Sequence, residues 1–163
     1  CLENFMGVPG RMERIVNREG LNIFVDYAHT PDALTNAILT LREAGFKRVL
    51  VMFGCGGNRD KGKRPLMGEA VAKLADIAIL TSDNPRFEDP HSIIEDVVPG
   101  LSRVSQLVIE EDRKLATKKA LELLTQDDAL LIAGKGHEEY QIINGVKHHY
   151  SDQEIVREFL NCA

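Results

Sequence analysis

Asp83, Asn84 and Arg86 place three complementary polar side chains within four residues of the chain. A carboxylate can bind an ammonium group, while an amide and a planar guanidinium can donate hydrogen bonds to a carboxylate. Together these groups match the two charges of a free amino acid. A loop whose polar groups cap the next helix is the commoner explanation for an Asp-Asn-Pro sequence, so a binding site needs further support.

The residues around this group predict a rigid loop at the end of a buried strand. The apolar run at residues 77–80 has the length and composition of a strand inside a sheet. Pro85 and Pro90 exclude a regular helix or a central strand between them, and they push the preceding residues toward extended conformations. In open α/β sheets, ligands bind at the carboxyl ends of the strands, where this loop is expected.

Three other predicted strands are also followed by polar or glycine-rich loops, at residues 26–32, 54–64 and 134–138. In a parallel sheet all of these loops would lie on one edge, which favours a binding site over a plain scaffold. Asp26 and His29 are candidates for an acid/base pair or a nucleotide contact. The commoner role for such a histidine is packing at a helix start.

Two glycine-rich segments match nucleotide-binding motifs only in part. Residues 57–63 begin like a phosphate-binding loop, but Arg64 follows where Ser or Thr must hold magnesium. This segment can still bind an anion, and a flexible basic loop is an equally good interpretation. Gly134-Lys135-Gly136 begins like a dinucleotide fingerprint, but Glu139 replaces its third glycine and no helical pattern follows.

Predicted strands and helices alternate along the chain. A strand within residues 10–16 and another at 21–25 should form a hairpin, and the Asn144-Gly145 turn predicts a second hairpin from 140–143 and 146–150. The other predicted strands are 48–53, 77–80, 106–109 and 129–132. Five helices are predicted. The first starts at Pro31 after the N-cap Thr30, and the next three span residues 65–74, 92–98 and 113–124, the last of them capped by Asp112. The fifth helix follows the N-cap Ser151.

This order predicts a Rossmann-like, doubly wound α/β fold. Its sheet would be mainly parallel, with helices on both faces and antiparallel strands or a hairpin at the edges. Residues 1–9 are expected to be a linker, and residues 10–163 one domain.

Composition describes an ordinary globular protein. The chain has 163 residues, of which 44% are hydrophobic and 28% charged, and a net charge of −5, which argues against a general nucleic-acid binder. No apolar run approaches the ~20 residues that span a membrane, and no signal peptide is visible. The three cysteines are far apart, which suits a reduced cytoplasmic protein. No His/Cys spacing indicates a metal site.

Read together, five segments resemble the Mur ligases, and among them those that add the third peptide residue to UDP-N-acetylmuramoyl-L-alanyl-D-glutamate in peptidoglycan precursor synthesis. The segments are Val8-Pro9-Gly10-Arg11-Met12-Glu13, residues 26–32, residues 54–65, residues 83–86 and residues 134–138. The resemblance covers the family's C-terminal domain, and its UDP-sugar and central ATPase domains have no counterpart here. Asn58 departs from the family, which more often has Asp at this position.

The resemblance implies an ATP-dependent ligation in which an acyl phosphate is attacked by the amine of the incoming amino acid, with magnesium on the phosphates. The ATP and Mg²⁺ would be bound mainly by the missing ATPase domain, and the isolated domain would be inactive. The resemblance assigns the diaminopimelate pocket to Arg59, Asp83, Asn84, Pro85, Arg86, Gly134 and Glu138. It assigns the ATP side to Arg11, Asp26 and His29, and it assigns no catalytic residue.

The Asp-Asn-Pro-Arg form of residues 83–86 is associated with meso-diaminopimelate. A guanidinium can bind the second carboxylate of this amino acid bidentately and gains little from lysine, which lacks it. Two other functions stay open: a nicotinamide-dependent oxidoreductase domain, and a non-catalytic amino-acid-binding module. Tight NAD binding would indicate the first, and independence from an ATPase domain the second.

Overall fold

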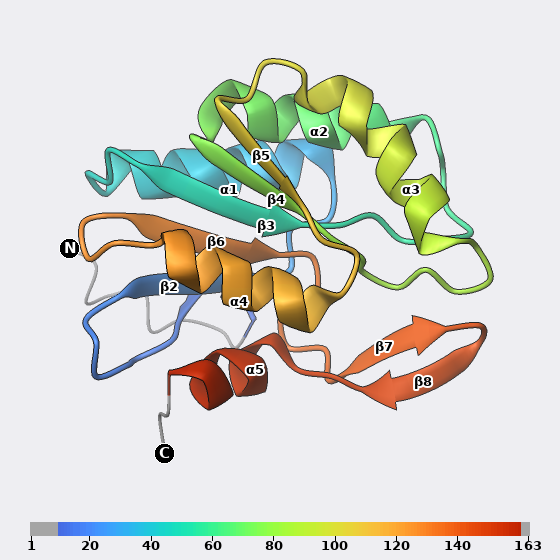
Figure 1. Cartoon of the computed structure of the whole chain (residues 1–163). Helices are drawn as coiled ribbons and strands as arrows, with labels where there is room; N and C mark the ends of the chain where they lie inside the picture. Colours follow the sequence, from blue (N-terminus) through green and yellow to red (C-terminus); the bar gives the residue numbers. More distant parts are fainter. Residues whose placement is uncertain (1–9, 161–163) are drawn as a thin grey trace.

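The computed structural model describes residues 10–160. The expected linker at residues 1–9, which includes Val8 and Pro9 of the first family-like segment, lies outside the described residues, as do Cys1 and Cys162. Within the described range, six strands form one sheet in the order β1-β2-β6-β3-β4-β5 (Figure 1). These strands are β1 (Glu13–Arg14), β2 (Asn22–Asp26), β3 (Val49–Phe53), β4 (Ile77–Leu80), β5 (Gln106–Ile109) and β6 (Ala129–Ala133).

All neighbouring strands of this sheet run parallel except β1, which pairs antiparallel with β2. The central strands β2, β6, β3 and β4 are buried along their whole length. Burial on both faces explains why residues 49–53, 77–80 and 129–133 are continuous apolar runs instead of alternating ones. The expected first hairpin is confirmed, although its first strand is only two residues long.

Helices cover both faces of this sheet (Figure 1). One face carries α1 (Pro31–Glu43), α2 (Lys63–Leu74), α3 (Pro90–Val97) and the 3-10 turn η2 (Val98–Leu101); the other carries α4 (Arg113–Leu123) and α5 (Asp152–Phe159). Successive strand side chains point to opposite faces, so Val51 packs in the core under α1 and α2, and Met52 in the core under α4 and α5. The predicted doubly wound α/β fold is confirmed. No helix of residues 10–160 has the length and apolar character needed to cross a membrane.

Two predicted helix starts, at Pro31 and Arg113, are confirmed together with their capping side chains. Thr30 Oγ1 accepts a hydrogen bond from the Ala33 amide at 3.2 Å. Asp112 Oδ1 accepts from the Leu115 amide at 3.1 Å. These side-chain acceptors satisfy amides that have no partner within the first turn of a helix.

Two helices begin earlier than the sequence predicts. Helix α2 begins at Lys63 instead of Pro65, because amides of the first turn need no intrahelical partner and a proline is tolerated there. Helix α3 begins at Pro90 instead of near Ser92, with Asp89 as its N-cap. The Asp89 carboxylate accepts a hydrogen bond from the His91 amide at 3.1 Å.

The C-terminal hairpin forms a small sheet of its own. Its strands β7 (Tyr140–Ile143) and β8 (Val146–His149) pair antiparallel. The Arg86 amide donates to the Ile142 carbonyl at 3.0 Å, and the Asn144 amide donates to the Arg86 carbonyl at 2.6 Å. These bonds attach the hairpin to the loop that follows β4. The hairpin is therefore as predicted, whereas its expected place at an edge of the main sheet is wrong.

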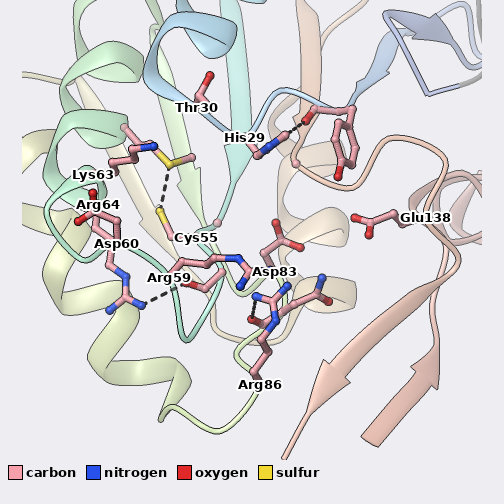
Figure 2. A pocket seen from close by; sticks show the side chains of 16 residues that line it. His29, Thr30, Cys55, Arg59, Asp60, Lys63, Arg64, Asp83, Arg86 and Glu138 are labelled. Carbon is pink, nitrogen blue, oxygen red and sulfur yellow. Dashed lines mark hydrogen bonds between the residues drawn. The ribbon is translucent and has the colours of Figure 1, made fainter. Parts of the chain in front are cut away.

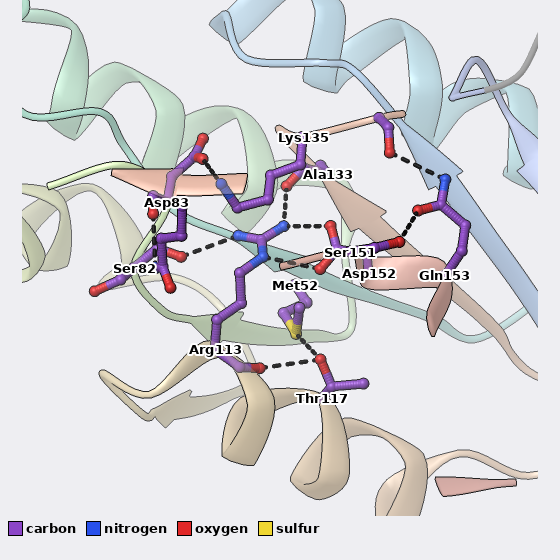
Figure 3. A network of polar contacts seen from close by, with 12 residues as sticks. Met52, Ser82, Asp83, Arg113, Thr117, Ala133, Lys135, Ser151, Asp152 and Gln153 are labelled. Atoms are coloured by element: carbon purple, nitrogen blue, oxygen red, sulfur yellow. Dashed lines mark hydrogen bonds and ion pairs between the residues drawn. The ribbon is translucent and has the colours of Figure 1, made fainter. Parts of the chain in front are cut away.

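Arg113 and Asp152 form a fully buried ion pair between α4 and α5 (Figure 3). Arg113 Nε and Nη2 each donate to an Asp152 carboxylate oxygen at 2.9 Å. The same guanidinium donates to the Ser82 carbonyl at 3.0 Å and the Ala133 carbonyl at 3.1 Å. Burial alone would lower the pKa of Arg113, but the charge of Asp152 outweighs burial and raises it. One side chain therefore joins two helices to the ends of two strands.

We expect Asp152→Ala to lower the free energy of unfolding by about 3–5 kcal/mol, because it leaves the Arg113 charge buried without a partner. Glu158→Ala is the matched control. It breaks the exposed Lys114–Glu158 pair between the same two helices, and it should cost less than about 1 kcal/mol. Urea unfolding of both variants measures the difference, and equal losses would contradict a special role for the buried pair.

Candidate functional site

The loops after β2, β3, β4 and β6 enclose a cavity of about 410 Å³ (Figure 2). This volume lies within the usual range for small-molecule sites. The prediction that these loops meet at one edge of the sheet is confirmed. The cavity is lined by Tyr27, His29, Thr30, Gly54, Cys55, Gly56, Arg59, Asp60, Lys63, Arg64, Met67, Asp83, Asn84, Arg86, Gly134 and Glu138.

Most of the residues expected at a site do meet in this cavity. They are His29, Arg59, Asp83, Asn84, Arg86, Gly134 and Glu138. Pro85, Arg11 and Asp26 do not line it. The Pro85 carbonyl instead packs against Gly57, where an added Cβ would lie only 1.8 Å from the carbonyl oxygen. The loops after β3 and β4 are therefore in direct backbone contact.

Arg59 and Arg86 lie close together on the cavity wall (Figure 2). Both pack against Gly56, where an added Cβ would lie 2.8 Å from Arg86 Nη1 and 3.6 Å from Arg59 Cγ. Arg86 Nη1 donates to the Gly57 carbonyl at 2.9 Å. Within residues 10–160, Arg86 Nε and Nη2 have no acceptor, and Arg59 has neither a hydrogen bond nor an ion pair. Two guanidiniums thus retain free donors, which suits a carboxylate ligand.

Arg86 adopts a left-handed backbone conformation with φ +55°. Such a conformation is uncommon for a residue other than glycine and is often found at functional sites. The hydrogen bonds with Ile142 and Asn144 hold it in place. The sequence predicts a rigid loop from the two prolines, whereas the structure adds the C-terminal hairpin as a second support.

Lys135 contacts Asp83 (Figure 3) and the neighbouring Asn84. Its side chain is fully buried, and Nζ lies 3.1 Å from Asp83 Oδ1 and 3.0 Å from Asn84 Oδ1. Sequence reasoning missed this residue, because only the glycines of Gly134-Lys135-Gly136 were considered there. A lysine only two residues after the apolar run at 129–133 was the available signal, since a lysine so close to a buried strand needs a buried partner.

Gly134-Lys135-Gly136 is not a dinucleotide-binding motif. The segment leads through a turn into β7, and no helix follows it. A bound pyrophosphate would require the N-terminus of a helix at this point. The nicotinamide-dependent alternative therefore loses its sequence support.

Arg64 explains why the segment at 57–63 lacks the Ser or Thr of a phosphate-binding loop. Its guanidinium is buried and pairs with Glu88 at 3.0 Å and with Asp96 at 2.8 Å, so it links α2 to α3. Lys63 lines the cavity as Arg64 does, but it forms no ion pair with any residue from 10 to 160. This basic segment therefore contains one cation that is paired within the protein, Arg64, and one without such a partner, Lys63.

Two titratable groups, Cys55 in the cavity lining and Tyr140 at the start of β7, have pKa values shifted by their surroundings. Burial raises the pKa of Cys55 to about 12, and its thiol contacts the Met67 sulfur at 3.4 Å, so a nucleophilic role has no support. A hydrogen bond to Glu138 and the charge of that carboxylate raise the pKa of Tyr140. Glu138 is therefore oriented by the first residue of β7.

Of the residues expected on the ATP side, His29 lines the cavity, whereas Arg11 and Asp26 lie outside its lining. Asp26 accepts hydrogen bonds from the Met12 amide and the Ala28 amide, both at 2.8 Å. These bonds tie the start of the described chain to β2 and leave the Arg11 guanidinium 5.1 Å from the centre of the Tyr27 ring. His29 is exposed, and its Nδ1 lies 2.8 Å from the Tyr27 carbonyl oxygen. Asp26 thus positions Arg11 instead of facing the cavity itself.

Metal ligands do not cluster in the described part of the chain: no three His, Cys, Asp or Glu side chains there are placed to hold an ion together. The residues present therefore do not form a magnesium site of their own.

This fold and cavity define an α/β domain with a charged pocket of amino-acid size. Residues 10–136 match the family described as Mur ligase, glutamate ligase domain, and the chain belongs to that family. A UDP-N-acetylmuramoyl-L-alanyl-D-glutamate--2,6-diaminopimelate ligase from Lawsonia intracellularis is 60% identical over 162 residues, which cover 99% of this chain and 34% of that protein. The chain thus spans about a third of this relative.

Solved structures give the same result. A UDP-N-acetylmuramoyl-L-alanyl-D-glutamate--2,6-diaminopimelate ligase matches with a TM-score of 0.87 at 46% identity, over 95% of this chain and 32% of the other. A Mycobacterium tuberculosis folylpolyglutamate synthase complexed with ADP matches with a TM-score of 0.63 at 20% identity, over 78% of this chain and 30% of the other. The second match supports the fold alone.

We expect Gly57→Ala to displace the loop that carries Arg86, because the new Cβ would overlap the Pro85 carbonyl. Overpacking of this kind costs about 1–3 kcal/mol. Gly62→Ala is the control: its φ of −64° suits alanine, its nearest neighbour is the flexible Asp60 carboxylate at 3.1 Å, and its effect should stay within about 0.5 kcal/mol. Urea unfolding measures both, and a neutral Gly57→Ala would show that the two loops are not in contact.

Proposed function

We propose that this chain is the amino-acid-binding domain of a longer ATP-dependent ligase, which adds meso-diaminopimelate to UDP-N-acetylmuramoyl-L-alanyl-D-glutamate. The observation that carries the proposal is the pair of guanidiniums with unused donors, Arg59 and Arg86, in one cavity with the carboxylates of Asp83 and Glu138. Two relatives, 60% and 46% identical to this chain, bear the name of such a ligase. That reaction belongs to peptidoglycan precursor synthesis in the bacterial cytoplasm.

The polar groups of the cavity are complementary to this ligand. Meso-diaminopimelate carries a carboxylate and an amine at each end, so it needs donors for the carboxylates and acceptors for the ammonium groups. Arg59 and Arg86 supply the donors, and Asp83 and Glu138 supply the acceptors. Gly134 leaves Asp83 Oδ2 accessible, since an added Cβ would lie 3.0 Å from that oxygen.

Arg86 is the residue that distinguishes diaminopimelate from lysine in this proposal. Lysine lacks the second carboxylate, so it leaves the Arg86 guanidinium without its bidentate partner. Pro85 and the hairpin contacts fix the backbone of Arg86 before a ligand arrives, which reduces the entropy lost on binding.

The residues of this chain act by holding the amino acid in place. In the longer ligase, ATP, bound with magnesium, supplies the phosphoryl group that activates the D-glutamate carboxylate. The pocket then presents one amine to that activated carboxylate, and fixing the two reactants in one geometry accelerates the attack. Closure of this domain over the rest of the ligase would bring the two together.

Arg11, Asp26 and His29 would face the nucleotide. Arg11 carries a charge that stacks on Tyr27 and is oriented by Asp26 through the Met12 amide. His29 lies exposed at the cavity rim. Magnesium would be held by the rest of the ligase, because the described residues gather no ligand set for it.

A non-catalytic amino-acid-binding module is the second candidate, because the cavity by itself would serve either function. We expect the isolated chain to form no product from meso-diaminopimelate, ATP and the UDP-linked acceptor, because it lacks a complete phosphate-binding loop. The longer protein should form product and ADP. Phosphate release measures both. Ligation by the isolated chain above a no-protein control would overturn this division of roles.

Arg86→Ala in the longer ligase should lower the preference for meso-diaminopimelate over lysine. A charged hydrogen-bonded contact contributes on the order of 1.5–3 kcal/mol, which is roughly a tenfold to hundredfold effect on affinity. Arg86→Lys should not restore the preference, because an ammonium cannot reproduce the planar fork. The ratio of kcat/KM for the two amino acids is the measurement.

Arg103→Ala is the control for this experiment, since Arg103 is exposed and does not line the cavity. An unchanged ratio in Arg86→Ala would mean that another arginine, Arg59 first, binds the second carboxylate.

A further inference from the structure

Lys135 is a buried cation that does not line the cavity, although it contacts two residues that do. Its side chain has no exposed surface. Nζ donates to Asn84 Oδ1 at 3.0 Å and to the Tyr140 carbonyl at 3.0 Å, and it lies 3.1 Å from Asp83 Oδ1. Nζ thus makes two hydrogen bonds, and its third contact, with Asp83 Oδ1, is an ion pair. Burial lowers the pKa of Lys135, and the Asp83 carboxylate opposes this effect.

The orientation of the Asn84 amide follows from its neighbours. Its Oδ1 accepts hydrogen bonds from Lys135 Nζ and from the Ile142 amide, both at 3.0 Å. Both neighbours are donors only, so the oxygen must face them and Nδ2 must face away. Asn84 lines the cavity, and its Nδ2 has no acceptor anywhere in residues 10–160. The side chain therefore offers the cavity two free N–H donors.

We infer that Lys135 is a positioning residue for amino-acid specificity: it fixes Asn84 with Nδ2 toward the cavity, so that this position accepts a ligand carboxylate and rejects an ammonium. This inference rests on the proposed function for the identity of the ligand. Lys135 itself does not touch the ligand. Without Lys135, only the Ile142 amide would hold the orientation of the Asn84 side chain. Asp83 would also lose its buried counter-charge.

The same lysine also secures the hairpin that supports Arg86. Lys135 Nζ holds the Tyr140 carbonyl at the start of β7, and Gln141 Nε2 donates to the Asp83 carbonyl at 2.7 Å. In the same strand, β7, the Ile142 carbonyl accepts a hydrogen bond from the Arg86 amide. The donor groups of Asn84 and Arg86 are thus positioned through one shared set of contacts.

The first test compares Lys135→Met with Lys114→Met in the longer ligase. Methionine keeps most of the side-chain length but removes all three donors, whereas Lys114 lies exposed on α4. Lys135→Met should raise the KM for meso-diaminopimelate about tenfold to a hundredfold. Its kcat should stay within about threefold, because the lost contacts serve binding equally in ground and transition states. A folded Lys135→Met enzyme with normal KM, or with a loss in kcat alone, would overturn the inference.

Asn84→Asp gives a second test that does not depend on Lys135→Met folding. It keeps an oxygen toward Lys135 and replaces only the cavity-facing nitrogen with a negatively charged oxygen. The KM for meso-diaminopimelate should rise at least as much as in Lys135→Met, and the KM for lysine should rise less. A near-normal KM for meso-diaminopimelate would show that the amide oxygen, not the nitrogen, faces the ligand.

Hydrogen exchange separates this inference from the proposed function. The Ile142 amide should exchange about tenfold faster in Lys135→Met than in wild type, because its acceptor Asn84 is no longer fixed, and no change is expected in Lys114→Met. If wild-type enzyme fails to use meso-diaminopimelate, the proposed function is wrong, yet exchange still tests Lys135. Unchanged exchange at Ile142 in a folded Lys135→Met protein would contradict the positioning role.

Discussion

The buried guanidinium of Arg113 determines where the walls of the cavity can lie. It binds the carbonyls of Ser82 and Ala133, and through Asp152 it fixes the start of α5. The residues directly after these two carbonyls, Asp83 and Gly134, both line the cavity. An unpaired charge at this depth would be strongly unfavourable, so the pairing leaves the two strand ends little freedom to separate.

Charge is arranged in two layers at this edge of the sheet. The first layer consists of the buried cations Arg113, Lys135 and Arg64. Each of them is paired with a carboxylate, so their charges are compensated within the protein. The second layer consists of Arg59 and Arg86, which line the cavity and have no carboxylate partner among residues 10–160. The paired cations of the first layer hold neighbouring elements together. The second layer leaves positive charge available to a carboxylate ligand. This separation is the physical basis for assigning amino-acid recognition to the cavity.

The sequence predicted the fold and much of the cavity lining because both depend on local signals. Continuous apolar runs, capping side chains such as Thr30, and loops after parallel strands were enough to place seven of the expected residues around one cavity. The buried cations were missed because their partners are distant in sequence: Arg113 pairs with Asp152, and Lys135 with Asp83. The place of the C-terminal hairpin likewise depends on backbone contacts to Arg86 that no local pattern encodes.

We propose above that this cavity binds an amino acid through its second carboxylate. A crystal structure of the longer ligase with meso-diaminopimelate tests it most directly. We expect one ligand carboxylate to accept from the Arg86 guanidinium at about 2.7–2.9 Å, with Asn84 Nδ2 donating to the same end of the ligand. A ligand bound outside the cavity, or bound with an ammonium group at Arg86 and Asn84, would contradict the account.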